Sequence, residues 1–220
     1  MKSQTISLVS SIFAACAFFL SWNAAFTCSF VQFSAINNDT PLNIGFGLWG
    51  HSWYALSASL NNSFIFQFCL SYTGTPLDGP MKAARVFAII ALVLGGVFFF
   101  SSLIAGCRPP DKRMLTRSEG VGYLLACLCQ GFALLLLNSN MCTNNSLIAA
   151  LQADIAQSEN VQIDFNDTCT LSTGARTCIS AIVFWFLAAL ASCHATSAGR
   201  KEEQARKGNL NEPLVPNDIL

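Results

Sequence analysis

Apolar residues gather in four long runs along the 220-residue chain, and each run lies in a gap without charged side chains. The gaps extend from Lys2 to Asp39, from Arg85 to Arg108, from Glu119 to Asp154 and from Arg176 to Arg200. Each holds a stretch at or near the roughly 18 to 20 apolar residues that cross a bilayer as a helix. The pattern predicts an all-α integral membrane four-helix bundle, with transmembrane helices at residues 6–26, 82–106, 119–138 and 175–198.

Between the first two helices the pattern changes to that of strands. In residues 63–72 the apolar side chains Phe64, Phe66, Phe68 and Leu70 alternate with others, which is the period of a β-strand. Residues 26–33 and 46–56 are further candidate strands, and turn-forming residues separate the three. We expect a small antiparallel sheet in residues 27–81. Residues 146–157, after the third helix, have apolar residues at helical spacing.

Basic residues predict the orientation, because loops rich in Lys and Arg are retained on the cytoplasmic side. They crowd residues 107–118 and follow the fourth helix, whereas residues 27–81 and 139–174 contain none. We therefore expect cytoplasmic segments at 1–5, 107–118 and 199–220, the last a disordered tail, and two extracellular loops between them. The prediction is a multi-pass protein of the plasma membrane that travels the secretory pathway. A cleavable signal peptide with small residues at Ala24 and Ala25 is the alternative for the first helix.

Composition adds a separation of charge. Only 11% of the residues are charged, below the roughly 25% of soluble domains. The formal net charge of zero hides an acidic outer side and a basic inner side. A basic inner face attracts anionic lipid, so we expect membrane lipid among the partners and no nucleic acid.

The predicted extracellular loops also hold every glycosylation acceptor triplet of the chain. A sugar acceptor of the form Asn-X-Ser/Thr indicates a surface loop in a secreted or membrane protein. The four acceptors are Asn38, Asn61, Asn144 and Asn166.

Four of the ten cysteines fall in these loops, where an oxidising exterior favours disulfides. Cys28 and Cys69 lie in the first loop, and Cys142 and Cys169 in the second. Three pairings are open, and we favour one bridge within each loop over the crossed alternatives. Cys178 lies near enough to compete for a partner. Cys107, beside basic residues at the inner membrane edge, is a candidate for palmitoylation.

One motif resembles a known family. Gly47-Leu48-Trp49 in the first outer loop, followed by a cysteine, by Leu77 and by an Ala-Ala-Arg that ends at Arg85, resembles the claudins and the wider peripheral-myelin-protein superfamily. The resemblance implies a sheet in the first loop, a tryptophan near the membrane surface and a disulfide between two strands. It also implies an arginine that anchors the sheet to the bundle. Trp49, Cys69 and Arg85 would take these roles.

The chain departs from that family in two places. Ser52 occupies the position where the family has its first cysteine, which leaves Cys28 as the loop partner for Cys69. The second outer loop is also longer than the short one typical of claudins. Proteins that share a fold can differ in activity, so the resemblance supports a prediction of the fold more than one of the function.

Catalytic groups are sparse. His51 lies in a predicted outer loop and His194 near the inner end of the fourth helix, so the two cannot share a site within one subunit. The sequence has no zinc-ligand spacing, phosphate-binding glycine loop or nucleophile elbow. We expect neither an enzyme nor a cofactor.

These expectations favour a claudin-like tetraspan protein that acts through its extracellular loops, in membrane organisation, adhesion or junction assembly. Its partner would be a second copy or another membrane protein. The alternative is an auxiliary subunit of a channel, a transporter or another larger membrane complex. The final residues, from Asp218 to Leu220, are a candidate ligand for a PDZ domain.

Overall fold

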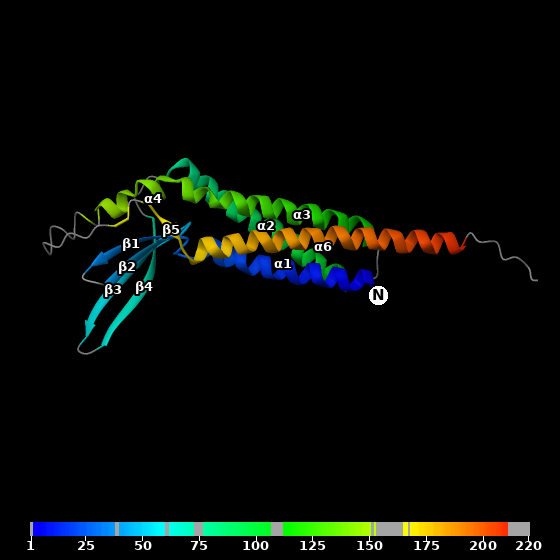
Figure 1. Cartoon of the computed structure of the whole chain (residues 1–220), viewed down its shortest axis with the longest axis horizontal. Coiled ribbons are helices and arrows are strands. Elements are labelled where there is room, and N and C mark those ends of the chain that lie inside the picture. The colour runs from blue at the N-terminus through cyan, green and yellow to red at the C-terminus, as the bar shows by residue number, and fades with distance from the viewer. Residues whose placement is uncertain are drawn as a thin grey trace, which may run out of the picture.

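A computed structural model describes residues 2–37, 40–59, 62–72, 77–106, 112–150, 152, 165–166 and 168–210. In this part of the chain four long helices run side by side, and a small sheet lies at one end of them (Figure 1). Several predicted sites lie outside the described residues, namely Asn38, Asn61, Cys107, Asp218 and Leu220.

The four helices are α1 (Lys2–Phe26), α2 (Gly79–Gly106), α3 (Lys112–Phe132) and α6 (Thr173–Leu210). Together with the short 3₁₀ helix η1 (Ala133–Asn138), they contain four stretches that are long and apolar enough to cross a membrane. The stretches are Leu8–Phe26, Gly79–Ile104, Ser118–Asn138 and Thr173–Ala198. The predicted four long apolar helices are confirmed.

Small residues bring α1 and α6 into close contact. The buried face of α1 repeats at intervals of three and four residues, which keeps it on one side of the helix. Its described buried residues are Ser10, Ala14, Ala17, Ser21, Ala24 and Ala25. Ser10 Oγ donates to the Ala188 carbonyl at 2.9 Å and lies 2.7 Å from Ser192 Oγ. In lipid, where water exclusion does not drive helices together, such close packing and interhelical hydrogen bonds do so.

A single large side chain fills the space that these small residues leave. Trp185 of α6 is fully buried and donates from Nε1 to Ser21 Oγ at 3.0 Å. Its ring stacks on Tyr123 of α3 with 5.6 Å between centroids. On its other side a Cβ at Gly95 of α2 would overlap the Trp185 ring, so glycine makes the room. Trp185 therefore contacts all three neighbouring helices.

A buried amide adds an interhelical hydrogen bond between α3 and α6. Gln130 of α3 is 1% exposed, and its Nε2 donates to Cys178 Sγ of α6 at 3.1 Å. Cys178 is thus part of the bundle, and it is not in either disulfide.

The sheet has five strands in the order β4-β3-β2-β1-β5, all antiparallel to their neighbours. The strands are β1 (Val31–Asn37), β2 (Thr40–Phe46), β3 (Gly50–Ser59), β4 (Asn62–Ser71) and β5 (Thr170–Leu171). The small antiparallel sheet predicted in the first loop is confirmed. β5 comes from the second loop, across 138 residues of sequence from Gln32, whose carbonyl accepts from Thr170 Oγ1.

Two predicted strands had wrong bounds. The candidate at 26–33 starts too early, because α1 continues to Phe26 and residues 27–30 form the connection to β1. The candidate at 46–56 joins two strands, because the chain turns at Gly47-Leu48-Trp49 between β2 and β3. The candidate at 63–72 matches β4 to within one residue at each end.

The helix ends also differ from the prediction. The third apolar run changes from α-helix to η1 at Ala133, and a short α4 (Asn140–Thr143) follows. The buried Ser139 Oγ donates to the Leu136 carbonyl at 2.7 Å and satisfies this end. Residues 146–150 are helical, as predicted for that segment.

At the other end of the bundle α6 continues to Leu210, where we expected a disordered tail from residue 199. In Figure 1 it extends beyond the other three helices. The sequence offers a reason, since Glu202 precedes Arg206 by four residues and Glu203 precedes Lys207 by four. Opposite charges at this spacing stabilise a helix.

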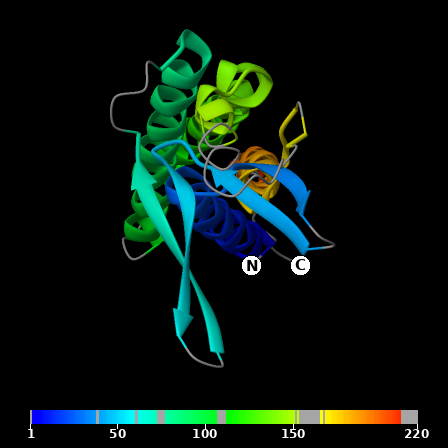
Figure 2. The ribbon, with the colours of Figure 1, turned by 90° about the vertical axis from the view of Figure 1, so that its left-hand side faces the viewer.

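The sheet packs on one end of the bundle through a continuous core. Strand residues such as Phe30, Phe33 and Phe46 share this core with Met81 and Ala84 of α2. Residues of η1 and α6 complete the cluster. Beyond it the β3–β4 hairpin projects away from the helices as an arm (Figure 2).

Candidate functional site

The motif Gly47-Leu48-Trp49 lies where the sheet contacts the bundle. We call this motif, together with Tyr72 and Arg85, the sheet–bundle junction. Leu48 is fully buried in the shared core, whereas Trp49 is 39% exposed. A Cβ at Gly47 would overlap the Thr27 carbonyl oxygen and lie 2.9 Å from Cys28 Cα. Only glycine allows the turn to approach the α1–β1 connection this closely.

Arg85 holds the junction from the side of α2. Its Nε donates to the Leu48 carbonyl at 2.6 Å. Its guanidinium lies 5.1 Å from the Trp49 ring centroid and 5.5 Å from that of Tyr72. Both distances are within the range of a cation–π interaction. Arg85 therefore contacts the motif by a charged hydrogen bond and by two aromatic rings.

Tyr72 completes the junction from the end of β4. Its hydroxyl donates to the Gly47 carbonyl at 2.9 Å, so both carbonyls before Trp49 are satisfied by side chains. Burial raises the pKa of Tyr72 well above its ordinary value, although the nearby charge of Arg85 acts in the opposite direction. Tyr72 was not predicted to belong to this site, because nothing local links a tyrosine after a strand to a motif 25 residues earlier.

His51 packs on the same group of rings. Its imidazole stacks on Phe46 at 5.9 Å and lies 5.7 Å from Tyr72. Its Nδ1 is buried without a hydrogen-bond partner in the described part of the chain. Burial lowers the pKa of His51, because an apolar surrounding disfavours the charged imidazolium.

Both disulfides join within one loop, as favoured from the sequence. Cys28 bonds Cys69, with 5.7 Å between the Cα atoms, and Cys142 bonds Cys169, with 5.0 Å. The first bridge ties the connection after α1 to the end of β4. The second holds α4 against the segment before β5, where the Cys169 amide also donates to the Cys142 carbonyl at 3.2 Å.

Ser52 is a polar residue, yet its side chain is buried in the sheet and bonds the neighbouring strand. It is 1% exposed and stands directly opposite Cys69 in the β3–β4 register. Gly45 N–H donates to Ser52 Oγ at 2.7 Å, and Ser52 Oγ donates to the Gly45 carbonyl at 3.2 Å. Among described residues β2 and β3 share one register pair, Phe46 with His51, so the side chain of Ser52 replaces the next backbone pair.

That replacement separates the outer part of β3 from β2 and sends the β3–β4 hairpin outward. β4 is the last strand of the sheet, and no described strand pairs with its outer edge. Its ten residues contain no Lys, Arg or Pro, the residues that usually block pairing at an edge. Within the described residues, the outer edge of β4 is therefore an unpaired strand edge at the far side of the sheet.

The other predicted site residues are separate from this edge. Asn144 and Asn166 are both exposed. Asp78 accepts from the Met81 amide at 3.2 Å and from the Asn140 amide at 2.6 Å, so it caps α2 and ties it to α4.

In the described residues no group of three or more His, Cys, Asp or Glu side chains gathers to hold a metal ion. His51 lies in the sheet and His194 near the opposite end of α6, at different ends of the molecule. The molecule is, as a class, a bundle of four helices suited to crossing a membrane, capped at one end by a disulfide-linked antiparallel sheet. Comparison with known proteins finds no protein-family model that matches the chain and no curated protein that resembles it.

Proposed function

We propose that this is a tetraspan membrane protein that acts by contacts of its extracellular loops with a second copy or another membrane protein. The motif resemblance to claudins motivates the class. Arg85 contacts the motif, but the bridge of Cys69 leads to the α1–β1 connection and not, as the resemblance implied, to a second strand. The proposed orientation has both termini in the cytoplasm and the sheet outside, because the loops that form the sheet lack Lys and Arg.

The unprotected edge of β4 is the observation that carries the proposal. A strand edge with free N–H and C=O groups pairs readily with another chain, and natural proteins block edges that are not meant to pair. Residues Asn62–Ser71 carry no blocking residue and lie on an arm that projects from the bundle (Figure 2). A sheet edge used for contact between proteins would have these properties.

The first experiment measures what the protein assembles with. The tagged chain is extracted in mild detergent, the mass of its complex is determined, and co-purifying proteins are identified. We expect homo-oligomers without a major second protein. A stoichiometric larger partner would instead support the auxiliary subunit, the alternative that the long second outer loop favours.

Matched variants then locate the contact. Ile65→Lys with Gln67→Lys adds charge to β4, whereas Leu171→Lys adds charge to β5, at the opposite edge of the sheet. Loss of oligomers in the β4 variant alone is the expected result. If both variants assemble like the unmodified protein, the β4 edge is not the contact.

A further inference from the structure

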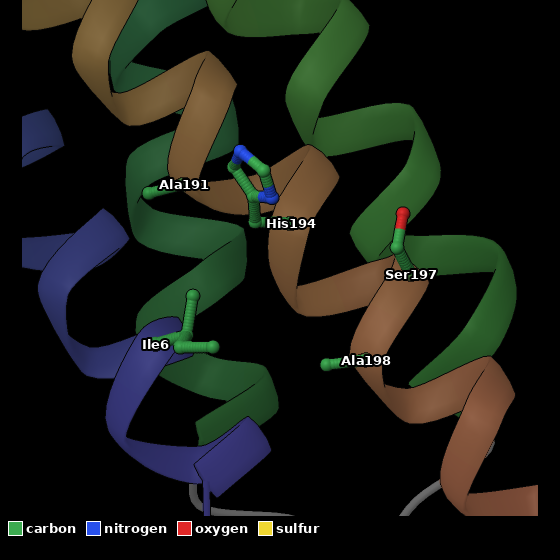
Figure 3. A pocket seen from close by; sticks show the side chains of 5 residues that line it. All are labelled: Ile6, Ala191, His194, Ser197 and Ala198. Atoms are coloured by element: carbon green, nitrogen blue, oxygen red, sulfur yellow. The ribbon is translucent and has the colours of Figure 1, made fainter.

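A hollow of about 500 Å³ lies between α1 and α6 at the end of the bundle far from the sheet. Figure 3 shows Ile6 of α1 on one side and, from α6, Ala191, His194, Ser197 and Ala198 on the other. Its volume is within the roughly 300 to 1,000 Å³ of small-molecule sites. The lining is mostly apolar, which suits a hydrocarbon better than a polar solute.

The hollow lies at the level where two apolar stretches end. The stretch in α1 begins at Leu8, just after Ile6, and the stretch in α6 ends at Ala198. The two helices run in opposite directions, since Ser10 contacts Ser192 while Ser21 contacts Trp185. The hollow therefore straddles the boundary between the proposed membrane interior and the inner headgroup layer.

The polar groups of the lining are few. Ser197 Oγ donates to the Cys193 carbonyl at 3.0 Å, so its proton is engaged within the helix. His194 is exposed, and Figure 3 shows its ring beside the ribbon of α6. Its ring N–H is a donor at the level where the ester and phosphate groups of a lipid lie.

Helical register adds one lysine from each helix. Lys2 precedes Ile6 by four residues, and Lys201 follows Ala198 by three and Ser197 by four. Residues three or four apart share a helix face, so both lysine positions continue the lining by one turn toward the cytoplasmic side. Lys207 follows Lys201 by six residues, which places it about 9 Å farther along α6, and it serves as a control.

We propose that this hollow binds an anionic phospholipid of the inner leaflet. One acyl chain lies against Ile6 and Ala191, and the phosphate lies at the level of Lys2 and Lys201, with His194 donating below it. Basic groups beside a hollow between membrane helices bind anionic headgroups in this manner. The inference rests on the proposed membrane insertion but is independent of the contacts of the outer loops.

The test is lipid binding to the purified full chain in mild detergent, read by native mass spectrometry with phosphatidylserine and phosphatidylcholine as probes. We expect tighter binding of phosphatidylserine. Lys2→Gln and Lys201→Gln should each weaken it about fivefold, the typical effect of one basic residue near a lipid surface. Lys207→Gln should change it less than twofold. Ala198→Leu, which fills the hollow, should reduce the binding of both lipids.

Three outcomes would overturn the inference. Equal affinity for the two lipids would remove the role of charge. An equal loss in Lys207→Gln and Lys201→Gln would show that the position of the lysine beside the hollow does not matter. Release of phosphatidylserine by millimolar inorganic phosphate would show a site for free anions and not for lipid. Thermal unfolding of each variant checks the fold, and the mass of the protein complex, read in the same experiment, tests the outer-loop contacts separately.

Discussion

At the scale of single residues, the junction depends on Arg85 more than on any other side chain. It supplies the contact from α2 to the motif, through the Leu48 carbonyl and the faces of Trp49 and Tyr72. Lysine would keep the charge but not the planar guanidinium that both stacks on a ring and donates from Nε. This residue was predicted as an anchor from the resemblance, and the geometry shows how it holds the sheet.

We expect Arg85→Ala to destabilise the protein by about 2 kcal/mol, from one charged hydrogen bond and two cation–π contacts at a partly buried site. Thermal unfolding in detergent, followed by tryptophan fluorescence, measures the change. Lys82→Ala on the exposed side of the same helix is the control. Equal unfolding temperatures for the two variants would show that Arg85 does not anchor the sheet.

His51 should make the stability of the sheet depend on pH. Burial lowers its pKa in the folded state, so below the ordinary value of about 6.5 the unfolded chain binds more protons than the folded one. Stability is therefore fully present above that value and falls as the pH decreases through it. We expect the unfolding temperature to decrease between pH 7.5 and pH 5.5. His51→Gln should remove most of that slope, and an unchanged slope would assign it to other groups.

At the scale of elements, two positions lie close to Cys69, namely Cys28 and Ser52. Cys69 bonds Cys28, yet its directly opposite neighbour across the strands is Ser52. Opposite residues in an antiparallel pair lie about 4.5 to 5.5 Å apart, within the Cα separations that disulfides accept. The fold thus places a second position, Ser52, opposite Cys69 at a separation that a disulfide accepts.

We expect Cys28→Ser to cost about 4 kcal/mol, because it opens a loop with a sequence separation of 41 residues. Adding Ser52→Cys should form a bridge to Cys69 and restore part of that stability, reduced by the lost hydrogen bonds to Gly45. Thiol counting by mass spectrometry shows whether the bridge forms. Two free thiols in the oxidised double variant would mean that the opposed positions do not meet the required geometry.

Helix packing supplies a second prediction at this scale. Gly95→Ala places a methyl group against Trp185, whereas a Cβ at Gly131 meets no atom within 4 Å. Overpacking a filled core costs about 1 to 3 kcal/mol, while alanine in an open helical position is favourable. Gly95→Ala should therefore unfold at a lower temperature than the native protein, and Gly131→Ala should not. If the two behave alike, Trp185 has room to move.

At the scale of the whole molecule, the four apolar stretches and the charge asymmetry predict one topology, with both termini in the cytoplasm and the sheet outside. A tag at the C-terminus should be accessible to antibody on cells only after permeabilisation. A sugar at Asn166, removed by Asn166→Gln and by an endoglycosidase, should report the outer side. Surface labelling of the C-terminal tag on intact cells would reverse the proposed orientation, and with it the leaflet of the proposed lipid.

The four apolar stretches, the pairing of cysteines within loops and the strand at 63–72 could all be predicted, because each depends on local properties. Hydropathy over about 20 residues, loop membership and side-chain alternation are read without knowing any distant contact. Only the tertiary structure decided that β5 joins the sheet, that Tyr72 meets the motif beside Arg85, and that Ser52 replaces a ladder pair. Those features join residues far apart in the chain, and their positions follow from packing the sheet on the bundle, which no local pattern contains.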